Sequence, residues 1–160
     1  MLQTRKKILT PSQALINIQK YCAYQERSHQ EVRDKLYSYG LHQTDVEDIL
    51  TQLITSGFLN EERFAKAFAG GKFRMKHWGR NKIENELKHR GISKRCIQTG
   101  LNEIDDSDYR QTLVQLIKKK SGLVEETNLF KKRDKVARFV IGKGYEPELV
   151  WRVVMDIIPD

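Results

Sequence analysis

Apolar positions recur along this chain with the period of an α-helix, and the same pattern occurs three times. Each copy contains two helical segments, a glycine and a third helical segment. The copies are separated by 51 residues (Val32 to Ile83) and then by 53 (Ile83 to Val136). The matched positions are Val32, Leu36, Gly40, Leu41, Val46, Leu50 and Leu53, then Ile83, Leu87, Gly91, Ile92, Ile97, Leu101 and Ile104, and then Val136, Val140, Gly144, Tyr145, Val150, Val154 and Ile157.

Repetition at this length is typical of tandem helical arrays, in which neighbouring units share apolar faces. No segment shows the sustained two-residue alternation of a half-buried strand. We therefore predict an all-α fold of three tandem three-helix, helix-turn-helix-like repeats that form an elongated, curved array. The predicted divisions are a basic N-terminal tail over 1–11 and repeats over 12–58, 59–104 and 105–160, the last with an inserted loop near 121–128.

Short capping motifs predict where several helices begin. Capping boxes occur at Thr10–Gln13, Ser28–Glu31 and Thr44–Glu47, each with a hydroxyl three residues before a Gln or Glu. Asn60 can cap a fourth helix, whose apolar side runs from Phe64 to Phe73. The first helix is expected to end near residue 26, and the first helix of the third repeat is expected near 107–120. Glycines at 70 and 71 predict a kink or a close helix contact within the fourth helix.

The composition is that of a soluble globular protein, because 31% of the residues are charged and no apolar run approaches the roughly 18 residues of a membrane span. The first residues, MLQTRKKILTPSQ, lack the apolar core of a secretory signal. Cys22 and Cys96 both lie in helical patterns, which fits two buried thiols in a reducing compartment. We expect a cytoplasmic protein.

Positive charge is concentrated in the middle of the chain. The net charge is +8, and residues 59–104 hold eleven Lys and Arg against five Asp and Glu. Such a surface favours phosphate backbones or an acidic protein surface, although a merely solubilising face carries the same signal. The candidate partner contacts are Lys72, Arg74, Lys76, Arg80, Lys82, Lys88, His89, Lys94, Arg95, Lys131, Lys132 and Arg133.

No catalytic constellation emerges from the sequence. Phosphate-binding glycine loops, zinc motifs and paired-cysteine motifs are all missing, and the four histidines have no metal-ligand spacing. We therefore expect no enzymatic activity, cofactor or metal. Phe64 and Phe68 are expected in the core and Trp78 as a packing wedge beside Gly79; base stacking is the alternative for these aromatic rings.

Three motifs together resemble the RecX family of regulatory proteins. Arg27-Ser28-x-x-Glu31-Val32 is similar to the R-S-x-x-E-L opening of that family, and Gly57 to Ala65 (GFLNEERFA) is similar to its G-Y-L-D-D-x-R-F-A signature. The third motif, Trp78-Gly79 with Leu87 and Gly91, resembles the G-x-x-x-I-x-x-E-L…G-I segment that follows in the family. The chain departs from the family pattern at Asn60-Glu61 and at the glycine pair. The positions that carry the resemblance, expected to be structural, are Arg27, Ser28, Glu31, Gly40, Gly57, Asn60, Arg63, Phe64, Ala65, Trp78, Gly79, Leu87 and Gly91.

The resemblance implies a monomeric bacterial modulator of the RecA recombinase, acting in homologous recombination and SOS DNA repair. Such proteins lie in the groove of the RecA–DNA filament, where they typically suppress ATP hydrolysis, strand exchange and coprotease activity. It implies RecA as the partner, with weak binding to single- or double-stranded DNA. The alternatives are a helix-turn-helix transcriptional or architectural protein that binds DNA directly, and a structural scaffold.

Overall fold

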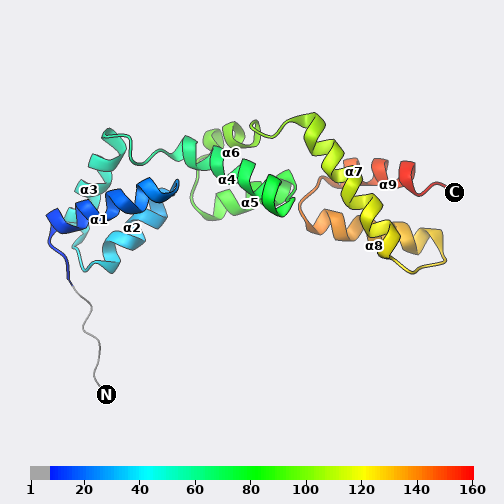
Figure 1. Cartoon of the computed structure of the whole chain (residues 1–160), viewed down its shortest axis with the longest axis horizontal. Helices are drawn as coiled ribbons and strands as arrows, with labels where there is room; N and C mark the ends of the chain where they lie inside the picture. Colours follow the sequence, from blue (N-terminus) through cyan, green and yellow to red (C-terminus); the bar gives the residue numbers. More distant parts are fainter. Residues whose placement is uncertain (1–7) are drawn as a thin grey trace, which may run out of the picture. The chain divides into compact units, whose positions relative to one another are not determined.

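The computed structural model describes residues 8–160, and over this range the chain is helical without strands (Figure 1). The all-α fold of tandem helical repeats is thereby confirmed, whereas the elongation and curvature of the array stay predictions. Residues 1–7 of the predicted basic tail lie outside the described residues. The helices are α1 (Pro11–Tyr24), α2 (His29–Ser38), α3 (Gln43–Thr55), α4 (Glu61–Lys76), α5 (Arg80–His89), α6 (Lys94–Leu101), α7 (Asp106–Leu123), α8 (Leu129–Gly142) and α9 (Pro147–Ile157).

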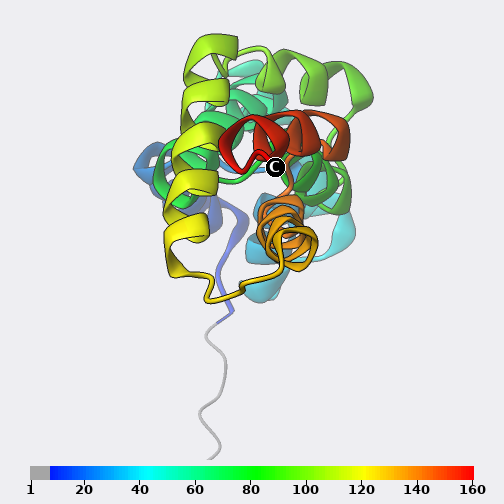
Figure 2. The ribbon, with the colours of Figure 1, turned by 90° about the vertical axis from the view of Figure 1, so that its right-hand side faces the viewer.

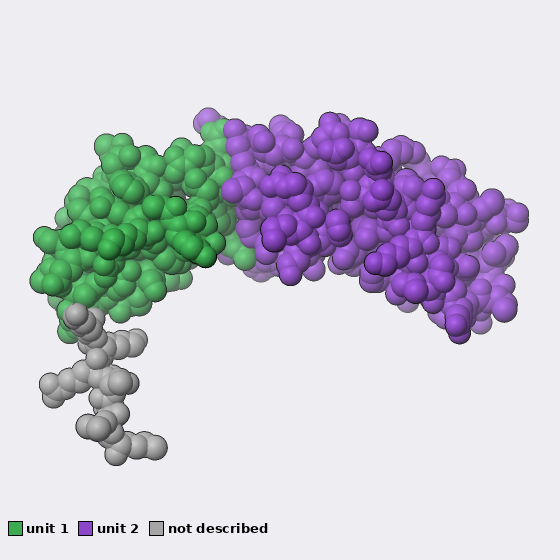
Figure 3. Space-filling model, in the orientation of Figure 1, with its two compact units in different colours: residues 1–64, 90–92 green, residues 65–89, 93–160 purple. Residues whose placement is uncertain are grey.

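The helices form two compact units (Figure 3). The first reaches Phe64 and includes Arg90–Ile92. In it, α1, α2 and α3 pack against one another around an apolar core. That core consists of Ala14, Ile18, Cys22, Val32, Leu36, Leu41, Val46, Ile49, Leu50, Leu53 and Leu59, most of which have the helical spacing predicted from the sequence.

The second unit comprises Ala65–His89 and Ser93–Asp160. In it α5 packs on α6, and α7, α8 and α9 pack on one another; Figure 2 shows these last three helices in yellow, orange and red. Aromatic rings join its elements, because the centroid of Tyr109 lies 5.8 Å from that of Phe73 and 4.9 Å from that of Tyr145. The second unit therefore has a continuous core from α4 to the start of α9.

Most predicted helix caps are present. Thr10 and Gln13 form the full capping box, the Ser28 hydroxyl accepts from the Glu31 N–H at 3.1 Å, and Asn60 Oδ1 accepts from the Arg63 N–H at 2.9 Å. Gly40 and Gly91 end α2 and α5 with positive φ, as their position after each helix predicted.

The predicted capping box at Thr44–Glu47 is wrong. Helix α3 begins at Gln43, and its N-cap is His42, whose side chain forms no capping bond. The His42 carbonyl already accepts from the Val46 N–H at 3.0 Å, so Thr44 lies inside the first turn rather than before it. Elsewhere the helix ends differ by a few residues: α1 ends at Tyr24, and α7 extends through Leu123, so the loop expected near 121–128 begins at Val124.

Two further expectations change. Cys22 is buried, but Cys96 is only half-buried. Helix α4 continues through the glycine pair. The nearest atoms to a Cβ at Gly70 would be those of the flexible Arg74 guanidinium, and a Cβ at Gly71 would meet nothing within 4 Å. The close contact of α4 lies instead at Ala65, whose carbonyl oxygen would be 2.7 Å from a Cβ on Gly100 of α6.

Candidate partner-binding surface

Two lysines of the second unit are held against an aromatic ring rather than by a carboxylate. The Nζ atoms of Lys72 (α4) and Lys82 (α5) lie 5.0 and 4.6 Å from the centroid of the Trp78 ring. Trp78 is half-buried and meets Phe68 edge-on, with 6.4 Å between centroids. Both ammonium groups are thus held near the surface with their charge uncompensated, since neither is ion-paired within the described range.

A second arrangement of the same kind occurs on α7 and α8. The Nζ atoms of Lys120 and Lys143 lie 4.3 and 5.7 Å from the centroid of Phe139, a ring that is 41% exposed. Both ammonium groups therefore lie within cation–π range of one exposed ring.

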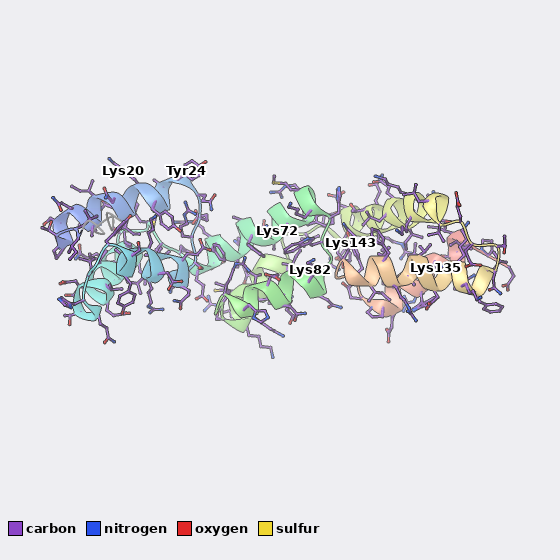
Figure 4. The ribbon with its side chains drawn as sticks, turned by 90° about the horizontal axis from the view of Figure 1, so that it is seen from below. Lys20, Tyr24, Lys72, Lys82, Lys135 and Lys143 are labelled. Atoms are coloured by element: carbon purple, nitrogen blue, oxygen red, sulfur yellow. The ribbon has the colours of Figure 1, made fainter. Side chains whose placement is uncertain are left out.

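The two arrangements are neighbours because the backbones of α5 and the α8–α9 turn touch. The Gly79 N–H donates to the Lys143 carbonyl at 2.8 Å, and the Asn81 N–H donates to the Gly144 carbonyl at 2.9 Å. Figure 4 shows Lys72, Lys82 and Lys143 gathered where α4 and α5 meet the end of α8. We call this surface the lysine–aromatic strip; it consists of Lys72, Trp78, Lys82, Lys143, Phe139 and Lys120.

The strip presents four cations that can meet anionic groups, either phosphates or carboxylates. Lysine is a compact point charge with three donors, so it can donate to either kind of oxygen without requiring a planar, two-point geometry. The half-buried Trp78 and exposed Phe139 add apolar area between the charges. This combination is suited to a large anionic partner rather than to a small enclosed ligand.

Other predicted cations are already paired within the protein. Arg80 forms an ion pair with Asp106, and the Nζ of Lys88 lies 3.1 Å from an oxygen of Glu84. Their charges are partly compensated, which weakens them as partner contacts. The remaining predicted positions are exposed or half-buried and lie outside the strip: Arg74, Lys76, His89, Lys94, Arg95, Lys131 and Lys132.

Arg133 is a correction to the predicted set. It is 3% exposed, its Nε donates to the Ile158 carbonyl at 2.7 Å, and its Nη2 lies 2.9 Å from an Asp160 oxygen. The guanidinium is therefore buried, bound to Ile158 and Asp160, and is not accessible to a partner.

Comparison with known proteins then places the chain. The family model for the second three-helix domain of RecX matches residues 60–101, and that for the third matches residues 107–154. The "Regulatory protein RecX" of Clostridium perfringens strain 13 is 30% identical over 122 residues, which is 75% of this chain. The chain belongs to the RecX family. The RecX protein of Clostridium botulinum strain Eklund 17B is 29% identical over 134 residues, or 82% of this chain.

The fold agrees with solved RecX structures. The crystal structure of RecX from Lactobacillus salivarius superposes with a TM-score of 0.83 at 21% identity, covering 92% of this chain and 96% of that one. The chain spans somewhat more than half the length of the curated RecX relatives, 57% for the C. perfringens protein and 62% for the C. botulinum protein.

Both RecX domain matches contribute to the strip. Lys72, Trp78 and Lys82 fall within the second domain, and Lys120, Phe139 and Lys143 within the third. Sequence reasoning found only Lys72 and Lys82 as cations of this surface. The missed signal was Phe139, an aromatic residue on the exposed side of a helix whose buried positions include Val136 and Val140.

Proposed function

We propose that this RecX-family chain regulates a RecA recombinase by binding the RecA–DNA filament, acting as a monomer in the cytoplasm. The expected effect is inhibition of RecA ATP hydrolysis, strand exchange and coprotease activity, and thereby of recombination and the SOS response. The single observation that carries the proposal is membership of the RecX family, whose curated members are named regulatory proteins. The chain itself is expected to catalyse no reaction.

The lysine–aromatic strip supports this proposal as the contact surface. An RecA–DNA filament offers both phosphates and acidic side chains, and the strip carries cations whose charge is uncompensated. The exposed cations outside the strip that were predicted from the sequence remain proposed secondary contacts. Ion pairing makes Arg80 and Lys88 weaker members of that set.

The deciding experiment measures ATP hydrolysis by the cognate RecA on single-stranded DNA while this chain is titrated from far below one copy per RecA. Inhibition at low ratios is the expected result. If hydrolysis and filament length stay unchanged at every ratio, the proposal is wrong. Sequence-selective binding to duplex DNA in the absence of any effect on RecA would favour the helix-turn-helix alternative.

A triple variant tests the strip. In Lys72→Gln/Lys82→Gln/Lys143→Gln we expect the half-inhibiting concentration to rise about tenfold, since three charge contacts of about 0.5 kcal/mol each sum to roughly the 1.4 kcal/mol of one decade.

The matched control is Lys20→Gln/Lys35→Gln/Lys135→Gln, which removes the same charge from positions outside the strip. Lys35 is a close match, because its ammonium also lies over aromatic rings, 5.5 Å from the centroid of Tyr21 and 5.9 Å from that of Tyr39. Equal weakening in both triple variants would mean that net charge, and not the strip, sets the affinity.

A further inference from the structure

Helix α5 begins without a capping side chain of its own. The residue before it is Gly79, which has no side-chain oxygen to accept from the free N–H groups of the first turn. Three of those groups are nevertheless paired. The Gly79 and Asn81 N–H groups donate to the carbonyls of Lys143 and Gly144, and the Arg80 N–H donates to the Tyr109 hydroxyl at 3.1 Å.

Tyr109 connects two helix starts through one hydroxyl. While its oxygen accepts from Arg80 at the start of α5, its proton is donated to the carboxylate of Glu146, the N-cap residue of α9. Burial and the hydrogen bond to Glu146 raise the pKa of the Tyr109 phenol far above its usual range, so the hydroxyl remains a donor. The Tyr109 ring is 1% exposed and stacks on Tyr145, whose hydroxyl donates to the His77 carbonyl at 3.0 Å.

Two glycines allow the backbones to meet at this point. A Cβ on Gly79 would lie 2.3 Å from the carbonyl carbon of Gly144, and a Cβ on Gly144 would lie 2.4 Å from the Cβ of Lys82. Gly144 also has a φ of 103°, which favours glycine. The contact therefore fixes the backbone of Lys143 beside that of Gly79. It thereby holds the half of the strip around Trp78 (Lys72 and Lys82) beside the half around Phe139 (Lys120 and Lys143).

We propose that the lysine–aromatic strip is one preformed binding surface, and that Tyr109 is the residue that positions its two halves. The inference rests on the proposed function, because it assigns the strip to a filament contact. Two halves held in a fixed relation engage one partner together, so that each raises the effective concentration of the other. Without the Tyr109 hydroxyl, only the glycine contact and the backbone bonds of Gly79 and Asn81 hold the two halves, so their relation loosens and the far half contributes less.

The first measurement needs no partner. Amide hydrogen exchange of the full chain reports how often the first turn of α5 opens, and Tyr109→Phe removes the hydroxyl while keeping the ring. We expect the Arg80 amide, with its neighbours Gly79 and Asn81, to exchange about tenfold faster, since a lost hydrogen bond is worth about one decade. Tyr24→Phe, at an 83% exposed position, is the control. Unchanged exchange in Tyr109→Phe overturns the proposal.

The second measurement separates positioning from mere structural support. We compare the half-inhibiting concentration with and without Lys120→Gln, first in the native background and then in Tyr109→Phe. A several-fold effect in the native background that is clearly smaller in Tyr109→Phe is the expected result. General destabilisation would leave the Lys120→Gln ratio unchanged, and an unchanged ratio overturns the positioning role.

Two precautions keep the outcome decisive. If Tyr109→Phe does not fold, as judged by circular dichroism, Glu146→Gln serves instead, because it weakens the bond to the Tyr109 hydroxyl without removing that group; it should speed exchange at Arg80 by a smaller factor. If the native chain fails to inhibit RecA, the proposed function is wrong, whereas the exchange experiment still decides whether Tyr109 holds the start of α5.

Discussion

Helices α2 and α5 occupy equivalent places in the repeat, yet they begin in different ways. The residue before α2 is Ser28 and the residue before α5 is Gly79, 51 positions later, which is the offset of the apolar pattern. Ser28 is fully buried and caps α2 with its own hydroxyl. The first turn of α5 instead bonds to Tyr109, Lys143 and Gly144. The first turn of α2 is therefore capped by a residue of its own repeat, whereas the first turn of α5 depends on residues of the following repeat.

The largest effect on stability is expected from Gly79→Ala, which disrupts the contact between the start of α5 and Gly144. The new Cβ would lie 2.3 Å from the backbone of Gly144, which cannot move aside as a flexible side chain would. We expect a loss of about 3 kcal/mol in the free energy of unfolding of the second unit, in the upper range for overpacking. Denaturant unfolding, followed by hydrogen exchange in α5, measures it.

Gly71→Ala is the matched control for that variant. Its Cβ would meet nothing within 4 Å, so the substitution should stabilise α4 by about 1 kcal/mol through helix propensity. A mild effect at both glycines would contradict the close contact between Gly79 and Gly144.

Ser28→Ala should have a smaller effect that is confined to the first unit. The variant loses the cap of α2 and leaves the Glu31 N–H without its acceptor, at a cost of about 1–2 kcal/mol. Hydrogen exchange should speed up at the start of α2 and stay unchanged at the start of α5. Ser38→Ala, at an exposed position, is the control and should stay within about 0.5 kcal/mol of the native chain. Loosening of α5 by Ser28→Ala would refute the independence of the two caps.

The smallest expected difference between α2 and α5 is in how their stability responds to acid. Burial lowers the pKa of His29, the first residue of α2, below its ordinary value of 6.5; Arg33 also lowers it and Glu61 raises it. The unfolded chain therefore takes up a proton at a higher pH than the folded chain does. This part of the stability is complete above pH 6.5 and is lost as the pH falls below 6.5 toward the folded pKa.

The acid response is measured as the protection of α2 amides between pH 7.5 and pH 5, after correction for intrinsic exchange. His29→Gln should flatten the profile at α2 and leave the first turn of α5 unaffected. An identical profile in the native chain and in His29→Gln would show that another group causes the acid sensitivity.

Local chemistry explains what could be predicted from the sequence. The caps at Thr10, Ser28 and Asn60 and the buried positions of α2, α3 and α5 follow from interactions within four residues along the chain, and they were predicted correctly. Tertiary contacts explain the failures. Arg133 lies near the start of a helix, next to two other cations, and so resembles a surface residue in the sequence. In the folded protein its side chain is buried and donates to the Ile158 carbonyl, 25 positions later.

The strip was only half predicted for the same reason. Lys72 and Lys82 are near Trp78 in sequence, so a basic surface there was recognisable. Lys120 and Lys143 come to the same ring, Phe139, only because α7 packs on α8. The role of Gly79 was equally hidden: a turn was predictable, but its approach to Gly144 depends on a residue 65 positions away.

The start of α5 also has a consequence for synthesis on the ribosome. Chains fold from the N-terminus as they emerge, each part closing when its contacts are available. Helix α2 has both partners of its cap as soon as Glu31 emerges, but the acceptors for α5 at Lys143 and Gly144 emerge more than sixty residues after Gly79. We therefore expect nascent chains arrested before residue 143 to carry a protected α2 and an unprotected start of α5.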